Sequence, residues 1–530
     1  MDKQQKLGLL LSSRLFKKRT DVEVVLNRTT LSWREIQRSQ KQDLDIGNSL
    51  DAAVSQVVPV SEIVSVQKTE EQHSETSSAH SRALEHNQLF LYAFTVSYVL
   101  RASKHQWRCT DVVFLCPDLT VCEQWIRAIS DQLSILANRP KSLLVYINPF
   151  GGKRQGKWIY DQKVAPLFSK ACISTDVIVT EQPNHARNHL ETKANLDKYD
   201  GVVCVGGDGI FSEIVHGLVT RTQDENKVDL NDSEAQLMPS ALRIGIIPAG
   251  STDCICFSTV GTNDPVTSAL HIIVGDSQPM DVCSVHHNSS FLRFFVSLLG
   301  YGFYGDVLTD SESKRWLGPT RYDLAGVKTF LNHNYYEGTI SFLPAEDNMS
   351  NPRDKLQCRS GCCVCQQRSS SKARDMMEEK KKSVKDRREG WTVLSGKFIA
   401  INTACISCAC PRSPKGLSPS AHLADGTMDL ILVRECSRID FLRHLLRHTN
   451  KDDQFDHQFV EVHRVKKFHF QPCRTEVSSL EDLSEIPRRA PSDQHAQPHR
   501  GVTATPPTAA GPATARSCPI MQFKSVSSAS

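Results

Sequence analysis

The sequence predicts a chain of three folded parts: a small β-domain closed by one helix, an α/β domain on a parallel sheet, and a β-rich domain. Three observations predict this order. The first part holds strand-like runs at 22–26, 91–99 and 111–116, followed by a helical pattern. The second holds four apolar runs separated by segments of helix length, and strand-like runs dominate from about 280 to 472. The predicted boundaries are 1–138, 139–278 and 279–473, with a solvated insertion at 366–390 and a tail at 474–530.

The helix of the first part has a clear start and a buried face. Asp118 is suited to an N-cap, because its side chain can accept a backbone N–H of the first turn. Apolar side chains then recur at helical spacing: Val121, Cys122, Trp125, Ile126, Ile129 and Leu133. Strands closed by one amphipathic helix with a buried Trp resemble a pleckstrin-homology domain, and this resemblance implies binding of phosphoinositide-type lipid head groups. An unrelated small β-domain is the alternative.

Glycine-bearing turns follow three of the four strand candidates of the second part. The four candidates are 143–147, 175–179, 202–205 and 243–247. The turns are Asn148-Pro149-Phe150-Gly151-Gly152-Lys153, Gly206-Gly207-Asp208-Gly209 and Pro248-Ala249-Gly250-Ser251-Thr252. Because the carboxyl ends of parallel strands share one edge of a sheet, these turns should converge on one cleft. Glycines let backbone N–H groups approach phosphate oxygens closely, which predicts a phosphate site.

The first of these turns is not a Walker loop. Residues 151–157 fit the spacing G-x-x-x-x-G-K, but Trp158 stands where that loop needs a Ser or Thr to hold Mg²⁺. Lys153 or Lys157 would still offer a point charge to a phosphate.

Asp208 is the candidate catalytic residue. A carboxylate held between glycines at the end of a strand can take the proton of an acceptor hydroxyl during phosphoryl transfer, or contact Mg²⁺. The alternative is an Asp that only caps the next helix. Glu213 follows in the early turns of that helix, where it faces either nucleotide and metal or solvent.

Together the three turns resemble the motifs of the diacylglycerol kinase catalytic family, which includes sphingosine and ceramide kinases. The resemblance covers about residues 139–470. It implies a Rossmann-like nucleotide domain, a β-sandwich domain, and transfer of phosphate from ATP with Mg²⁺ to a lipid hydroxyl. The N-terminal module, the stretch 297–306, the pattern Cys358-x3-Cys362-x2-Cys365 and the block 407–414 resemble the ceramide kinase branch, which implies ceramide in membranes as substrate.

The same resemblance assigns roles to individual residues. It implies ATP contacts from Asn148, Pro149, Phe150, Gly151, Gly152, Thr180, Glu213, Gly250, Ser251, Arg315 and Arg321. It implies substrate contacts from Gly206, Gly207, Asp208, Gly209 and Asp306, with Asp208 as proton acceptor. Guanidinium groups suit phosphate oxygens, although ordinary solvent-facing arginines are the alternative for the two Arg positions.

The C-terminal end departs from the family pattern. The family's Asp-Gly-Glu triplet and the last strand that follows it are not found after residue 470, and the tail, rich in Pro, Ser, Ala and Thr, is predicted to be disordered. Other readings therefore stay open: a sphingosine or diacylglycerol kinase, a relative of NAD kinases or phosphofructokinases that shares the Gly-Gly-Asp-Gly turn, or a catalytically impaired lipid-binding scaffold.

Two weaker signals lie in the third part. Cys362, Cys365, Cys405 and Cys408 form two C-x-x-C pairs, which would suit a structural Zn²⁺ site or remain reduced thiols. The segment 437–448 is a basic amphipathic helix with one face predicted from Ile439, Leu442, Leu445 and Leu446. The family resemblance implies Ca²⁺ regulation through calmodulin at this segment, and a core-packing helix is the alternative.

Composition limits the remaining classes. The formal net charge is +4 over 530 residues, and no nucleic acid partner is expected. The chain has no run of roughly 18 apolar residues, and its N-terminal apolar run is too short for a secretory signal. The 18 cysteines are therefore expected to be reduced, in a cytoplasmic protein bound peripherally to membranes. The family resemblance implies Golgi and plasma membrane.

Overall fold

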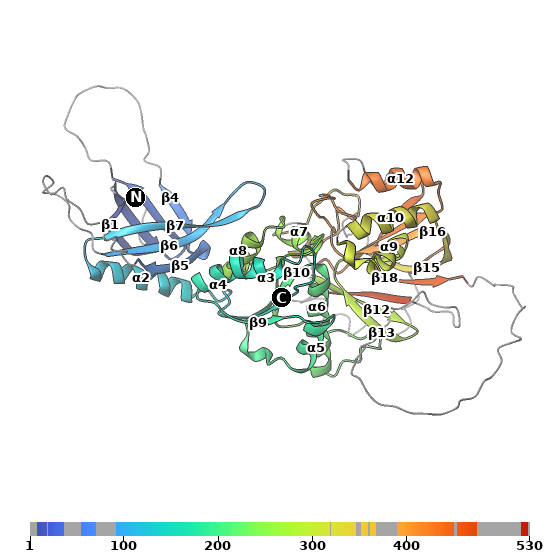
Figure 1. Cartoon of the computed structure of the whole chain (residues 1–530), viewed down its shortest axis with the longest axis horizontal. Coiled ribbons are helices and arrows are strands. Elements are labelled where there is room, and N and C mark those ends of the chain that lie inside the picture. Colours follow the sequence, from blue (N-terminus) through green and yellow to red (C-terminus); the bar gives the residue numbers. More distant parts are fainter. Residues whose placement is uncertain are drawn as a thin grey trace, which may run out of the picture.

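The computed structural model contains the three predicted parts in the predicted order (Figure 1). It describes residues 8–18, 20–36, 55–69, 92–318, 320–345, 351–358, 361–366, 390–449, 453–473 and 521–527. Most of the predicted insertion, 367–389, and most of the predicted tail, 474–520 and 528–530, lie outside these residues.

The N-terminal part is a seven-stranded antiparallel sheet, ordered β4-β3-β2-β1-β7-β6-β5 and closed by helix α2. Its elements are β1 (Leu9–Lys17), β2 (Thr20–Asn27), β3 (Thr30–Glu35), β4 (Gln56–Pro59), η1 (Val60–Glu62), β5 (Ile63–Lys68), β6 (Tyr92–Arg101), β7 (Trp107–Cys116) and α2 (Leu119–Ser134). The predicted cap is confirmed, since Asp118 accepts the backbone N–H of Val121 at 2.9 Å. The Trp125 ring is fully buried, and its indole N–H donates to Ser13 at 3.1 Å.

The second part is a parallel sheet with the order β11-β10-β8-β9, as the apolar runs predict. Its strands are β8 (Ser142–Ile147), β9 (Ser174–Val179), β10 (Gly201–Gly206) and β11 (Arg243–Pro248). Its helices are α3 (Gly156–Ile159), the π-helix η2 (Tyr160–Val164), α4 (Ala165–Lys170), α5 (His185–Thr192), η3 (Leu196–Lys198), α6 (Asp208–Glu225), α7 (Cys254–Val260) and α8 (Pro265–Val274). Strand order reverses between β8 and β10, where ligands of open α/β sheets bind.

A specific contact joins the first two parts. The guanidinium of Arg139 donates to the carbonyl oxygens of Ile63 at 2.7 Å, Val64 at 3.1 Å and Ile273 at 3.2 Å. The Trp107 ring stacks on His271 of α8 with ring centroids 3.7 Å apart. These contacts fix the N-terminal domain against α8, on the face of the parallel sheet that packs around Val203 and Leu270.

The third part is an eight-stranded antiparallel sheet in which four strands close into a ring. Its strands are β12 (Asp281–His287), β13 (Ser290–Phe295), β14 (Leu298–Gly302), β15 (Tyr336–Pro344), β16 (Thr392–Ala404), β17 (Met428–Arg434), β18 (Val460–Pro472) and β19 (Met521–Ser527). Its helices are α9 (Phe303–Glu312), η4 (Arg315–Leu317), α10 (Thr320–Asn332) and α12 (Arg438–Arg447). Both β15 and β17 pair with β16 and with β18, so these four strands enclose one apolar core.

The last strand, β19, corrects the prediction that the whole tail is disordered and that no strand follows residue 470. It lies between β12 and β18, with Ser525 opposite Cys283 and Phe523 opposite Phe468. Both neighbours present backbone N–H and C=O groups along an open edge, and pairing satisfies them almost regardless of local composition. The surrounding Pro-rich and Ser-rich composition does not predict this seven-residue strand, because its partner strands are remote in the chain.

Within the described part of the chain, no helix is both long enough and apolar enough to cross a bilayer.

Candidate functional site

The three glycine turns pack against one another at the edge of the parallel sheet, as the sequence predicts. A Cβ on Gly152, whose φ is +55°, would lie 2.6 Å from the carbonyl oxygens of Ala249 and Gly250. A Cβ on Gly250 would lie 2.5 Å from the Cα of Gly207. Real Cβ atoms do not approach backbone this closely, so only glycine allows the turns to meet. The turns therefore present bare backbone at this edge of the sheet, which suits phosphate oxygens.

Asn148 holds the first turn in shape. Its side-chain oxygen accepts the backbone N–H groups of Phe150 at 2.9 Å and Gly151 at 3.1 Å, an Asx-type turn. Its own backbone N–H donates to Val205 at the end of β10 at 2.9 Å, which ties the first turn to the second. Phe150 is 64% exposed. The turn that begins at Pro149 is therefore open to a ligand on its outer side.

Asp208, the predicted catalytic residue, lies at the first position of α6 in the middle of these turns. Its two carboxylate oxygens accept the backbone N–H groups of Cys254 at 3.1 Å and Ile255 at 2.9 Å, at the start of α7. The capping alternative is thus present in part, although the capped helix is α7, not the one that Asp208 begins. These two bonds fix the carboxylate at the point where the second and third turns meet.

Asp253 also belongs to the site, although it is not among the residues predicted from the sequence. It adopts a left-handed conformation, φ +53°, and its carboxylate accepts the backbone N–H of Gly250 at 2.9 Å. Burial raises the pKa of Asp253 to about 7; the nearby Asp208 charge adds to this shift and the Gly250 hydrogen bond opposes it. Its position directly after a glycine turn, at the carboxyl edge of the sheet, is the signal that could have found it.

Two predicted ATP contacts are engaged in structural hydrogen bonds. The hydroxyl of Thr180 is buried and donates to the carbonyl oxygen of Ile147 at 3.2 Å, joining the ends of β9 and β8. The carboxylate of Glu213 accepts backbone N–H groups of Asn184 and Ala186 at the start of α5. Burial is the main cause that raises the pKa of Glu213. Ser251, by contrast, is exposed on the third turn.

The remaining predicted contacts lie in the third part of the chain. Asp306, in the first turn of α9, accepts a hydrogen bond from the hydroxyl of Tyr336 on β15. Burial and then this carboxylate raise the pKa of Tyr336. The Arg321 guanidinium stacks on the ring of Tyr322 at 4.6 Å and lies 3.6 Å from Glu312. The backbone of Arg315 lies in η4, and its side chain is outside the described residues.

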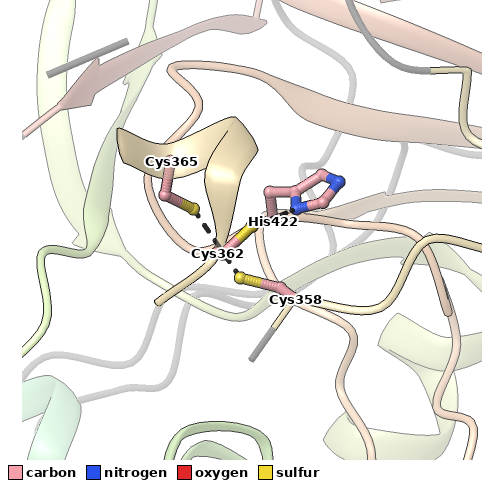
Figure 2. Close-up of side chains that lie close together, drawn as sticks. All are labelled: Cys358, Cys362, Cys365 and His422. Atoms are coloured by element: carbon pink, nitrogen blue, oxygen red, sulfur yellow. Dashed lines mark hydrogen bonds between the residues drawn. The ribbon is translucent and has the colours of Figure 1, made fainter. Parts of the chain in front are cut away.

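The four cysteines predicted as zinc ligands are not brought together. The sulfur of Cys405 lies 3.2 Å from that of Cys283, inside the core of the third part. Cys408 is hydrogen-bonded with Cys254 of α7. Cys362 and Cys365 instead gather with Cys358 and His422 (Figure 2). The two C-x-x-C pairs therefore have different partners, one pair before β16 and the other after it, which local spacing does not reveal.

The basic segment 437–448 forms α12, capped by Ser437. The side that packs on the core consists of Phe441 and His444, with Leu445 of the predicted apolar face beside them. Burial lowers the pKa of His444 to about 3, so this side chain is neutral. Three of the four residues of the predicted face are instead solvent-exposed: Ile439, Leu442 and Leu446.

The parallel sheet with its glycine turns and the antiparallel domain that follows it both lie in segments that match known protein families. Residues 142–285 match the diacylglycerol kinase catalytic domain. Residues 11–129 match the ceramide kinase PH domain, and residues 295–499 match the ceramide kinase C-terminal domain. The chain belongs to the ceramide kinase family.

Individual relatives agree with this assignment. The protein named ceramide kinase from Homo sapiens is 57% identical over 418 residues, which are 78% of this chain and 76% of that protein. The one from Mus musculus is 54% identical over 429 residues, 80% of this chain and 79% of that protein. Ceramide kinase 1 from Caenorhabditis elegans is 31% identical over 383 residues, 71% of this chain and 67% of that protein.

The close packing of the turns predicts that Gly250→Ala weakens nucleotide binding and lowers the free energy of unfolding by about 1–3 kcal/mol, because the new methyl group pushes the turns apart. Isothermal titration with ATP and chemical denaturation measure both effects. Gly326→Ala on α10 is the matched control, since its Cβ meets nothing within 4 Å. Equal ATP affinity for the two variants would contradict the packing argument.

The raised pKa of Asp253 predicts a pH effect on stability. Between the ordinary carboxyl pKa of 3.8 and about 7 the folded chain binds more protons here than the unfolded chain, so this contribution falls as the pH rises through that window. Asp253→Asn keeps the acceptor for Gly250 and removes the titration. Chemical denaturation from about pH 5 to about pH 8 should show a smaller loss of stability for the variant than for the unaltered chain. Parallel pH profiles would contradict the assignment.

Proposed function

We propose that this chain transfers the γ-phosphoryl group of ATP to the primary hydroxyl of ceramide, forming ceramide 1-phosphate. The observation that carries the proposal is the meeting of three glycine turns around Asp208 at the β8–β10 switch point, in a member of the ceramide kinase family.

The ATP phosphates lie against the glycine turns in this proposal. The backbone of Gly152, Gly207 and Gly250 is close-packed on one side and carries no side chain on the other, so phosphate oxygens can approach these turns closely. The N–H of Gly250 already donates to Asp253 and serves to hold the third turn. The exposed Phe150 and Ser251 lie on the outer surface of these turns. Phosphoryl transfer depends mainly on positioning and on stabilising charge, and a rigid backbone cradle supplies the positioning.

Asp208 receives the acceptor hydroxyl. Two N–H groups of α7 and the Cys254 thiol bond to this carboxylate, which has about four lone-pair sites, so it can still accept the hydroxyl hydrogen bond without leaving its place. The aligned hydroxyl loses its proton to Asp208 as the oxygen attacks the γ-phosphorus. Bound Mg²⁺ would neutralise phosphate charge, and the carboxylate of Asp208 is a ligand of the type that it prefers.

Asp253 limits the negative charge of the site. With a pKa of about 7, it is partly protonated at neutral pH and then does not repel the phosphates as a full carboxylate would. Its tie to Gly250 also holds the third turn in position for the second.

Two helices of the third part supply a surface for the bilayer in which ceramide resides. Leu324, Val327 and Leu331 of α10 are 51%, 59% and 62% exposed, and Ile439, Leu442 and Leu446 of α12 are 65%, 45% and 55% exposed. Both sets follow the i, i+3, i+7 spacing of a single helix face. Figure 1 shows α10 and α12 as neighbours in the third part. The rings of Phe330 on α10 and Phe441 on α12 stack with centroids 6.2 Å apart. Exposed apolar stripes of this kind are typical of membrane-contacting helices.

Calmodulin binding at 437–448 stays a prediction, and such binding would require part of the core of the third part to open. A partner that wraps α12 would have to withdraw Phe441 and His444 from the core of the third part.

The missing Asp-Gly-Glu triplet favours a second candidate, a lipid-binding protein that holds ATP without transfer.

The first test is transfer of labelled γ-phosphate to ceramide, sphingosine and diacylglycerol in mixed micelles with Mg²⁺. We expect ceramide to be the preferred acceptor and Asp208→Asn to lower the rate by at least about 100-fold, because the proton acceptor is lost. Titration with ATP controls for the nucleotide site in the variant. Preference for another lipid would overturn the substrate, and ATP binding without any transfer by the unaltered chain would favour the lipid-binding candidate.

The bilayer surface has its own test. Val327→Glu combined with Leu442→Glu should reduce sedimentation with vesicles of phosphatidylcholine and ceramide, since each change puts a charge on an apolar stripe. Leu292→Glu on β13, at a residue 50% exposed, is the control. Transfer to a water-dispersed short-chain ceramide should stay near the unaltered level. Undiminished vesicle binding by the double variant would contradict this surface.

A further inference from the structure

Three thiols and one imidazole converge in the third part of the chain, outside the site described above. Cys365 lies in a short helical turn after β15, and Cys362 directly precedes that turn. Cys358 lies a few residues earlier, and His422 lies in the long loop between β16 and β17. Figure 2 shows the four side chains directed toward one another. Their sulfur and nitrogen atoms all lie within 4.8 Å of each other.

The separations match the edges of a tetrahedral zinc site. Zn–S bonds of about 2.3 Å and a Zn–N bond of about 2.0 Å place neighbouring ligand atoms about 3.5–3.8 Å apart. The sulfurs of Cys358 and Cys365 are 3.7 Å apart, and the Cys362 sulfur lies 3.3 Å from Nδ1 of His422. A disulfide would need about 2.05 Å between two sulfurs, and it would leave the third thiol and the imidazole unexplained.

The surroundings suit thiolates bound to a cation. Cys365 and His422 are buried, with 7% and 2% of their surfaces exposed. The backbone N–H of Leu423 donates to the sulfur of Cys358 at 3.4 Å, and that of Ala424 donates to Cys365. Such N–H groups stabilise negative sulfur and orient the ligands of a metal. The neighbouring Cys363 is exposed and is not a member of the cluster, so the grouping is specific to three of the four local cysteines.

We propose that Cys358, Cys362, Cys365 and His422 bind one Zn²⁺ ion in a closed, structural site. Four protein ligands of the Cys₃His type fill a tetrahedral shell and leave no position for substrate. Of the four cysteines with C-x-x-C spacing, only one pair takes part; the other ligands are Cys358 and the distant His422.

The bound ion would hold the β16–β17 loop against β12 and, through Leu423 and Ala424, against the core of the α/β domain. Next to His422, the Leu423 carbonyl accepts the backbone N–H of Asp281 at 2.6 Å, and Gly426 donates to the Asp281 carboxylate at 2.5 Å. The start of the same loop touches α7, where the hydroxyl of Ser407 donates to that of Ser258 at 3.2 Å. Because α7 also carries the amides that fix Asp208, the zinc site would stabilise one wall of the phosphate cleft from a distance.

Metal content of the full chain tests the proposal. Protein purified without chelator should carry about one zinc per chain by plasma mass spectrometry, and Cys362→Ser and His422→Gln should each lose most of it. Cys363→Ser is the matched control and should retain the metal. Removal of zinc should lower the melting temperature of the unaltered chain, and added Zn²⁺ should restore it.

A spectroscopic test avoids variants that fail to fold. The unaltered chain, produced with Co²⁺ in place of Zn²⁺, should show the intense visible bands of tetrahedral Co²⁺ and a thiolate charge-transfer band in the near ultraviolet. Chain that is folded but binds neither metal would overturn the proposal. So would equal metal loss in Cys363→Ser, or a mass spectrum showing a disulfide between Cys358 and Cys365. These readouts do not depend on lipid phosphorylation, so failure of the proposed kinase activity would leave the zinc result intact.

Discussion

The contact among the backbones of Gly152, Gly207 and Gly250 is the constraint on which the catalytic part of the chain depends. Each of these residues follows a different strand of the parallel sheet, and each would place a Cβ within about 3 Å of another turn. The absence of three side chains therefore brings three turns to one point. Asp208 and Asp253 then take their places by hydrogen bonds to the same turns and to the helix that follows them.

Helix α7 links this cleft to the rest of the molecule. Its first backbone amides donate to the Asp208 carboxylate. Its Cys254 is hydrogen-bonded with Cys408, and its Ser258 accepts a hydrogen bond from Ser407. The loop that supplies Cys408 and Ser407 also carries His422 of the proposed zinc site. A metal ion far from the phosphates would thus act on catalysis only by ordering this loop, in the way that structural zinc sites order folds too irregular for a large core.

Elements whose partners are local or follow a simple period were predictable. The four parallel strands, the Asp118 cap and the buried Trp125 each follow from a short run of residues. The strand β19 and the packing face of α12 were not, because both depend on what the rest of the fold presents. The short strand β19 forms because the edges of β12 and β18 are available for pairing. On α12, Phe441 and His444 are buried although a more apolar stripe lies on another side of the helix.

The sequence by itself determined the three-part order, the meeting of the glycine turns and the candidate role of Asp208, because strand period and turn chemistry are written locally. Only the tertiary structure decided that Asp253 is buried beside Asp208, and that Cys358 and His422, not Cys405 and Cys408, join Cys362 and Cys365. Burial and ligand geometry arise when segments distant in sequence are brought within a few ångströms, and no spacing rule encodes that distance.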